Sequence, residues 1–267
     1  MDSRPIGVFD SGLGGLTVVK EIVKALPKED IIYLGDTARI PYGTRSKEVV
    51  VKFAKEDTKF LLGKRVKCVV IACNTASAFA FRCLKNKYSI SIFDVITPAS
   101  KSVLKKSKNK IVGVIGTRGT IASGAYNREL GEKRNGVKIY AQACPLFVPL
   151  IEEGEIGGAI IKAVVKKYLR YFLNKPIDTL ILGCTHYPII KQEIKSFLGR
   201  NLTYINPGKE VALELKRYLI KNGLLNNKTK KGNTKYFVTD INKNFKETAD
   251  MFLEKSISTK IQKVSIS

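Results

Sequence analysis

The sequence predicts an α/β fold of two pseudo-symmetric domains, each a mainly parallel sheet flanked by helices, with an active site in the cleft between them. Short apolar runs alternate with amphipathic stretches, a pattern typical of parallel strands that helices cover on both faces. The segments "PIGVFDSGLGGLTV" (5–18) and "KIVGVIGTRGTIAS" (110–123) also echo each other. Each is followed further along the chain by a strand-like run that ends in cysteine, which indicates two related units.

Continuous apolar runs predict the strands of the two sheets. In chain order they are residues 5–9, 31–35, 67–72, 111–116, 137–141 and 178–183. In sheets of this kind, ligands bind in the loops that follow the carboxyl ends of the strands. The residues directly after these runs are therefore the first candidates for a functional site.

The stretch 46–63 predicts a helix with Ser46 as its N-cap, a position that favours serine. Apolar residues at helical spacing would share one face of this helix. These are Val50, Phe53, Ala54 and Leu61.

Two proline-bearing segments, 96–100 and 205–210, are breaks suited to crossings between the two units. The C-terminal segment would then return to the first unit. We therefore place the first domain at 1–98 and 211–267, and the second at 99–210.

The composition bounds the class of protein. The 267 residues include 47 Lys plus Arg against 23 Asp plus Glu, a net charge of +24. Such a charge attracts nucleic acid, but the lysines are spread thinly over predicted helices and no nucleic-acid-binding signature accompanies them, so this partner is not favoured. No apolar stretch approaches the ~18 residues of a membrane span, and "MDSRPIGVFD" does not read as a signal peptide. A cytoplasmic location is expected.

The cysteines predict free thiols. There are five, none in a C-x-x-C pair, and the single histidine leaves no familiar zinc-ligand set, so no metal site is predicted. Cys68, Cys83 and Cys144 are interpreted as packing residues.

Cys73 follows a strand-like run and precedes a helical pattern, "NTASAFAFRCL". A cysteine at such a turn would have its thiolate favoured by the helix N-terminus. Asn74 and Thr75 would offer donors to an anion such as a carboxylate. A packing role for Cys73 is the plain alternative.

Cys184 repeats this arrangement, and the repetition makes a functional role more credible for both cysteines. The residues Thr185 and His186 follow it, and Pro188 would be the first residue of a helix. His186 is near enough in sequence to tune or reprotonate the thiol.

Polar turns follow the first two strands. The glycines of "FDSGLGGLTV" permit a tight loop with Asp10 and Ser11 at its mouth, where Asp10 would hold an ammonium group or assist a base. Thr17 stands where a dinucleotide fingerprint needs glycine, and no P-loop lysine follows. In the loop 35–46, Tyr42 and Gly43 would donate hydrogen bonds to a ligand.

Two thiols across a polar cleft are compatible with several chemistries. A disulfide oxidoreductase normally uses C-x-x-C, and a cysteine hydrolase would leave the second thiol idle. Thiols on opposite faces of one carbon suit inversion of a stereocentre, in which one takes a proton and the other returns it. From the residues alone these readings stay open.

The motifs "GVFDSGLGGLTV", "GDTARIPYG", "ACNTASA" and "LGCTHYP", which span residues 7–188, together resemble the glutamate racemases of the cofactor-independent aspartate/glutamate racemase superfamily. "CPLFVPLIEEGE" (144–155) is similar to a central segment of that family. The resemblance implies an isomerase, a glutamate racemase that interconverts L- and D-glutamate by two-thiol proton transfer, with no cofactor. Its D-glutamate would supply peptidoglycan biosynthesis.

The resemblance also implies the roles of residues. Cys73 and Cys184 would be the catalytic thiols, the first assisted by Asp10 and the second by His186. The substrate would be bound by Asp10, Ser11, Tyr42, Gly43, Asn74, Thr75, Thr185 and His186. Glu152, or its neighbour Glu153, would add a polar contact.

Alternatives from within and outside the superfamily are kept. A racemase of aspartate or of hydantoins would share the motifs, and a basic nucleic-acid-binding protein would account for the charge. The implied partner is a small molecule, without a membrane, and association into a homodimer is left open.

Overall fold

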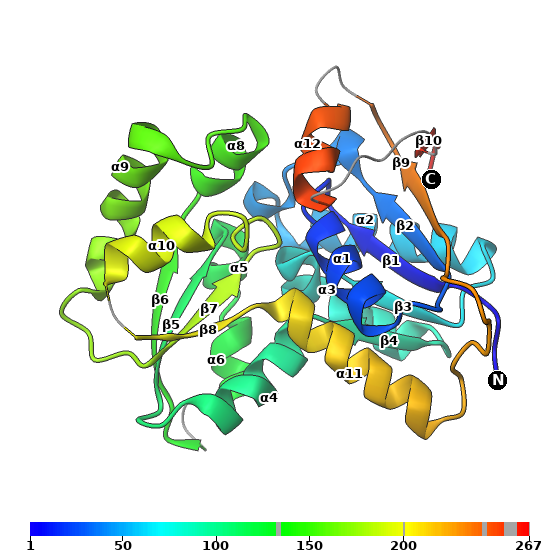
Figure 1. The fold of residues 1–267 in the computed structure, drawn as a ribbon, viewed down its shortest axis with the longest axis horizontal. Coiled ribbons are helices and arrows are strands. Elements are labelled where there is room, and N and C mark those ends of the chain that lie inside the picture. Colours follow the sequence, from blue (N-terminus) through cyan, green and yellow to red (C-terminus); the bar gives the residue numbers. More distant parts are fainter. Residues whose placement is uncertain (132–134, 200, 242–244, 254–260, 267) are drawn as a thin grey trace.

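The computed structural model describes residues 1–131, 135–199, 201–241, 245–253 and 261–266. These residues form two parallel sheets flanked by helices, which confirms the predicted α/β class. Figure 1 shows the two sheets beside each other, the first at the right of the view and the second at the left.

The first sheet has the strand order β10-β9-β2-β1-β3-β4, and its described pairs are all parallel. Its central strands are fully buried, as the apolar runs require. The strands are β1 (Ile6–Asp10), β2 (Ile31–Gly35), β3 (Cys68–Ile71), β4 (Ser91–Asp94), β9 (Thr234–Val238) and β10 (Ile261–Lys263).

The second sheet has the order β6-β5-β7-β8 and is also parallel. Its strands are β5 (Ile111–Gly116), β6 (Lys138–Ala143), β7 (Thr179–Gly183) and β8 (Thr203–Ile205). This order matches β2-β1-β3-β4 of the first sheet, because in each set the first strand along the chain lies between the second and the third. The topology therefore makes β3 and β7 equivalent, and each is followed by one of the two cysteines singled out from the sequence.

The predicted apolar runs correspond to β1, β2, β3, β5, β6 and β7 within one or two residues at each end. The runs do not include β4, β8, β9 and β10. Of these, β4, β8 and β10 are short strands at sheet edges, where one side of the strand needs no partner and the apolar signal is weak.

Helices cover both sheets. The predicted helix is α2, with Ser46 accepting a hydrogen bond from the Val49 amide at 3.4 Å; on its predicted face Val50, Ala54 and Leu61 are buried and Phe53 is partly buried. The helices are α1 (Leu16–Ala25), α2 (Lys47–Gly63), α3 (Asn74–Lys87), α4 (Ile96–Lys106), α5 (Arg118–Ala122), α6 (Ala125–Leu130), α8 (Phe147–Glu152), α9 (Gly158–Leu169), α10 (Lys191–Leu198), α11 (Pro207–Lys221) and α12 (Phe245–Leu253), with 3-10 turns η1 (Thr37–Arg39), η2 (Tyr42–Thr44) and η3 (Arg170–Phe172).

The chain crosses between the sheets along α4 and α11. Helix α4 leads from β4 to β5, and α11 leads from β8 back to β9. The expected breaks at 96–100 and 205–210 are therefore helix starts: Pro98 lies in the first turn of α4 and Pro207 begins α11, positions where a missing amide proton costs nothing. The domain limits at 98/99 and 210/211 stay a prediction.

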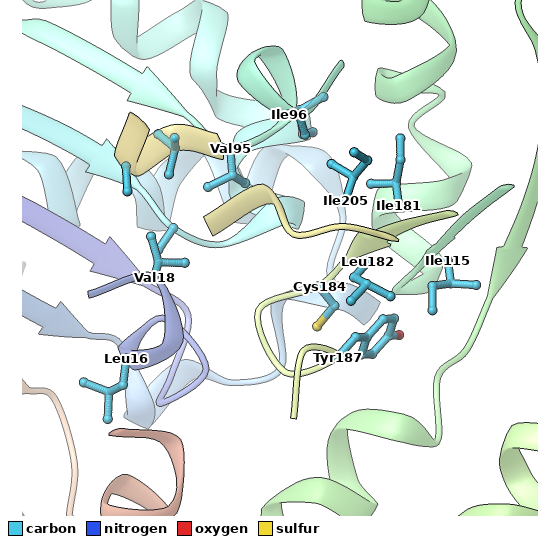
Figure 2. Close-up of a cluster of buried hydrophobic side chains, with 14 of the residues drawn as sticks. Leu16, Val18, Val95, Ile96, Ile115, Ile181, Leu182, Cys184, Tyr187 and Ile205 are labelled. Atoms are coloured by element: carbon cyan, nitrogen blue, oxygen red, sulfur yellow. The ribbon is translucent and has the colours of Figure 1, made fainter. Parts of the chain in front are cut away.

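A large buried cluster joins the two sheets. It contains Leu16 and Val18 of α1, and also Leu182 and Cys184 at the end of β7 (Figure 2). A second cluster lies between the first sheet and helices α2 and α3, and it includes Cys73. Both cysteines are thus held by packed cores rather than by mobile loops, which fixes where their thiols point.

Candidate active site

A cavity of about 360 Å³ lies where the carboxyl ends of both sheets meet. Both Cys73 and Cys184 line it, one from each sheet, as the topology predicts. The other predicted residues on its wall are Ser11, Tyr42, Gly43, Asn74, Thr75, Glu152, Thr185 and His186.

Cys73 is the N-cap of α3, and its thiol accepts a hydrogen bond from the Ala76 amide at 3.5 Å. Burial nevertheless raises the pKa of Cys73 to about 12, and the nearby Asp10 carboxylate raises it further, against the smaller opposing hydrogen bonds from Ser11 and Ala76. The helix N-terminus thus favours the thiolate, as expected, but desolvation is the larger effect. At neutral pH, Cys73 therefore carries its proton.

Cys184 ends β7, but the segment after it is a series of tight turns and not a helix. The amides of Tyr187 and Ile189 bond to the carbonyls of Cys184 and His186, and α10 begins only at Lys191. The placement of Pro188 as a first helical residue was therefore wrong. The turns bring the His186 Nδ1 atom to 3.7 Å from the Cys184 thiol.

His186 is buried between two acidic partners. Its Nε2 atom lies 3.0 Å from Glu152 Oε1, while Nδ1 faces Cys184. Burial alone would lower the pKa of His186, but the hydrogen bonds to Cys184 and Glu152 outweigh it and raise the pKa to about 10. The ring is therefore an imidazolium at neutral pH. Glu153 is exposed, so Glu152 is the acid that takes part in this contact.

Asp10 is fully buried behind the cavity wall and does not line the cavity itself. One carboxylate oxygen accepts a hydrogen bond from the backbone amide of Gly12 at 3.1 Å. The other has no hydrogen-bond partner among the described residues. Burial raises the pKa of Asp10, and the charge of His186 together with the Gly15 and Gly12 amides opposes that shift.

The cavity wall also carries hydrogen-bonding groups from both domains. The Asn74 side-chain oxygen accepts the Tyr126 hydroxyl at 2.7 Å, so its amide nitrogen is the end left for a ligand. The Thr75 hydroxyl lies 2.9 Å from that of Thr117 and 3.2 Å from that of Thr120. These contacts join α3 of the first domain to α5 of the second across the floor of the site.

Tyr42 lines the cavity, but its hydroxyl does not serve it. That hydroxyl donates to the buried carboxylates of Asp36 and Asp57. The hydroxyl is therefore already engaged, and the predicted donation by Tyr42 and Gly43 would come from their backbone amides. These carboxylates belong to a buried acidic cluster under the loop, which no local sequence pattern predicts.

Sequence reasoning missed part of the wall. Thr117 and Arg118 line the cavity from the start of α5, and Pro145, Val148 and Pro149 form an apolar side near α8. Thr117 and Arg118 lie in "KIVGVIGTRGTIAS", the echo of the first glycine loop. Taking that echo as structural equivalence would have pointed to them, because Thr117 and Arg118 follow β5 as Ser11 and Gly12 follow β1.

The remaining cysteines are packing residues as predicted: Cys68 and Cys144 are buried, Cys83 is half-buried on α3, and none is on the cavity wall. Among the described residues, no three His, Cys, Asp or Glu side chains are grouped to hold a metal ion. None of the described helices is long and apolar enough to cross a membrane.

Comparisons with known proteins agree with this geometry. The family model described as Asp/Glu/Hydantoin racemase matches residues 6–214. A glutamate racemase of Aquifex aeolicus is 48% identical over 96% of both chains. The crystal structure of glutamate racemase from Francisella tularensis in complex with D-glutamate is 44% identical, covers 99% of this chain and 98% of its own, and superposes with a TM-score of 0.93. Picrophilus torridus aspartate racemase shares the fold, at 18% identity and a TM-score of 0.59 over 92% and 99% of the two chains.

Proposed function

Because this chain belongs to the Asp/Glu/Hydantoin racemase family, we propose that it interconverts L- and D-glutamate by proton transfer between Cys73 and Cys184. The observation that carries the proposal is the placement of both thiols on one cavity, each from the equivalent strand of its own sheet. Glutamate is favoured over aspartate because curated glutamate racemases are 42–49% identical to the chain, whereas the aspartate racemase shares the fold alone.

The charges around the thiols suit a two-base mechanism. Burial and Asp10 keep the proton on Cys73, while the His186 imidazolium faces the Cys184 sulfur at 3.7 Å, so in the proposed reaction Cys184 acts first, as the thiolate base. That thiolate takes the α-proton of one enantiomer, and the electron pair of the C–H bond passes to the α-carbon and its carboxylate. Cys73 then donates its proton to the opposite face. The product is the other enantiomer, with the thiol and thiolate exchanged and ready for the reverse reaction.

Hydrogen-bond donors must stabilise the charge that builds up in this step. We assign the substrate carboxylates to backbone and side-chain donors of Ser11, Gly43, Asn74, Thr75 and Thr185, which come from both domains. Closure of the two domains on the substrate would exclude water and strengthen these interactions. Asp10 would assist Cys73, as His186 assists Cys184.

In the cell, this activity would supply D-glutamate for peptidoglycan, in the cytoplasm where the amino acid is available. The absence of a cofactor and association into a homodimer stay predictions.

The test is proton NMR of the protein with L-glutamate in deuterated water, without added cofactor and with a chelator, alongside polarimetry. We expect the α-proton signal and the optical rotation to disappear together. The variants Cys73→Ala and Cys184→Ala should lose racemisation by roughly 10²-fold or more, because each removes an acid/base group.

Cys83→Ala is the matched control, since that thiol lies on α3 but away from the cavity wall. Full racemisation in either active-site variant would rule out the two-thiol mechanism. Turnover of aspartate in preference to glutamate would instead identify aspartate as the substrate.

A further inference from the structure

One contact of His186 comes from a helix that no motif identifies. The ring of Phe252 in α12 packs against the imidazole with ring centroids 5.1 Å apart and an interplanar angle of 89°. Phe252 is 2% exposed, so the contact is a buried one. Helix α12 lies beyond residue 214, where the match to the family model ends.

The other contacts of the imidazole do not cover the side on which Phe252 packs. Glu152 lies at Nε2, and Cys184 and Thr185 lie at Nδ1 at 3.7 Å and 3.4 Å. The Cε1 side faces Gly14 so closely that a Cβ there would be 2.4 Å away. Phe252 supplies the aromatic surface that completes the enclosure.

Helix α12 is itself fixed against the first domain. It packs on α1, beside which it lies in Figure 1, and Phe252 and Leu253 belong to the same buried cluster as Leu16 of α1. The chain thus returns from the second sheet to bring an aromatic ring to the histidine of the second domain.

The physical consequences of this contact bear on catalysis. Edge-to-face aromatic pairs have a preferred orientation and stabilise a contact beyond what burial of their surface contributes. An aromatic neighbour is also compatible with an imidazolium, and it excludes water that would weaken the attraction among His186, Glu152 and Cys184.

We propose that Phe252 is a positioning residue for racemisation, which orients His186 toward the Cys184 thiol and makes α12 a part of the active site. The proposal rests on the proposed function. It predicts that Phe252 acts only through His186.

The kinetic test is a double-mutant cycle with Phe252→Ala, His186→Gln and the double variant, with glutamate racemisation measured in both directions. Phe252→Ala should lower kcat about three- to tenfold, the range that an aromatic pair would supply, and leave KM within about twofold. Phe252→Leu, which keeps apolar bulk, should lose less. In the His186→Gln background, the effect of Phe252→Ala should vanish.

Leu253→Ala is the matched control, because Leu253 is buried in the same helix and has no contact with His186 among those described. A loss in Leu253→Ala equal to that in Phe252→Ala would overturn the proposal, since docking of the helix would then be all that matters. A loss that persists in the His186→Gln background would overturn it equally.

A second readout does not depend on turnover. The chain has one histidine, so the imidazole proton signal in an NMR spectrum needs no assignment. Removal of the ring in Phe252→Ala should shift this signal, because the ring current is lost, whereas Leu253→Ala should leave it in place. An unshifted signal in Phe252→Ala would overturn the contact. Wild-type protein that fails to racemise glutamate would overturn the proposed function, whereas active wild type with either contrary result above would overturn only the role of Phe252.

Discussion

The pKa of the single histidine is set by one neighbour close in the sequence and one distant from it. Glu152, 34 positions away, and Cys184 hold the pKa of His186 at about 10 although burial acts in the opposite direction. Asp10 and burial act on Cys73 so that its pKa rises to about 12. Cys73 is therefore the thiol that holds its proton, whereas the sulfur of Cys184 faces His186 at 3.7 Å.

Glu152→Gln should lower the pKa of His186, because the amide removes the negative charge at 3.0 Å from Nε2. The alkaline limb of the pH profile of kcat/KM should then move to lower pH, since that limb reports loss of the imidazolium in the free enzyme. Racemisation rates from pH 6 to 11 would check this. An unchanged alkaline limb would contradict the role given to Glu152.

The same shift predicts a change of stability with pH. The folded pKa of about 10 lies above the usual 6.5, so the contribution of His186 is fully present below about pH 6.5 and is lost as pH rises through 10. The wild type should therefore exceed Glu152→Gln in free energy of unfolding at neutral pH, and the difference should shrink toward pH 10 and above. Urea unfolding of both proteins across this range measures it. A difference independent of pH would contradict the ion pair.

At the scale of elements, the active site depends on the close approach of two loops. The turn after β1 contains Gly14, and it lies directly against the turn after β7, which carries Thr185 and His186. The Thr17 hydroxyl also donates to the Thr185 carbonyl at 2.8 Å. The first domain thereby positions the turn of the second domain that carries Thr185 and His186.

Gly14→Ala should displace that turn. The added Cβ would lie 2.3 Å from Thr185 Oγ1 and 2.4 Å from His186 Cε1, closer than atoms can approach. A displacement near 1 Å costs on the order of 10²-fold in rate, so kcat should fall by about that factor while the fold is retained. Gly63→Ala, where no atom lies within 4 Å of the new Cβ, is the control and should keep full activity. Equal activity of both variants would contradict this account.

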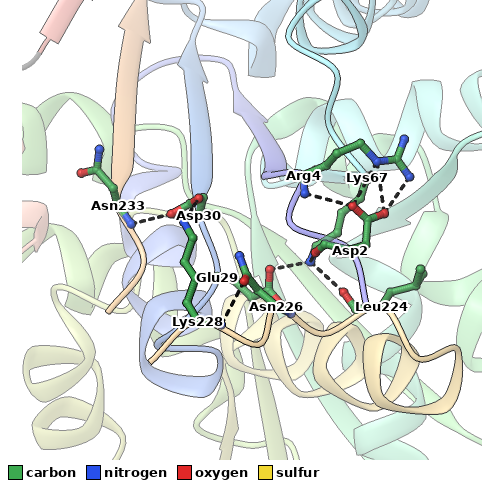
Figure 3. A network of polar contacts seen from close by, with 9 residues as sticks. All are labelled: Asp2, Arg4, Glu29, Asp30, Lys67, Leu224, Asn226, Lys228 and Asn233. Atoms are coloured by element: carbon green, nitrogen blue, oxygen red, sulfur yellow. Dashed lines mark hydrogen bonds and ion pairs between the residues drawn. The ribbon is translucent and has the colours of Figure 1, made fainter. Parts of the chain in front are cut away.

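At the scale of the whole molecule, a buried ion pair lies in the first domain, at the end of the sheet opposite the cavity. Lys67 Nζ lies 2.5 Å from Glu29 Oε2 and donates to the carbonyls of Asp2 and Leu224 at 2.9 Å and 2.8 Å (Figure 3). The backbone amide of Asn226 donates a hydrogen bond to the Glu29 carboxylate at 2.8 Å. The cluster fastens the segment that returns from α11 to the first sheet.

Lys67→Met should lower the free energy of unfolding by about 3–5 kcal/mol, because it leaves the Glu29 carboxylate buried without its counter-ion. The activity of the folded fraction should be unchanged, since Lys67 precedes β3 and Cys73 follows it. Chemical denaturation with a parallel racemisation assay tests both statements. The double variant Lys67→Met with Glu29→Gln should be destabilised by less than the sum of the single variants. Strict additivity would show that the pair is not coupled.

The sequence by itself determined the local features of this protein. Apolar runs located the central strands, because a strand covered on both faces must be apolar along its length. The same runs placed Cys73 and Cys184 after the carboxyl ends of their strands, which is where ligands bind in such sheets. That both thiols line one cavity depends on how the two sheets pack against each other. The short edge strands, such as β8 and β10, left no comparable signal.

Only the tertiary structure decided the features that depend on burial and on partners far apart in the chain. The Tyr42 hydroxyl is taken by Asp57, and Phe252 reaches His186 from the last described helix. The pKa of Cys73 rises although the helix N-terminus acts to lower it. The physical reason is common to all three: desolvation and long-range contacts are set by how the whole chain packs, and no stretch of neighbouring residues contains that information.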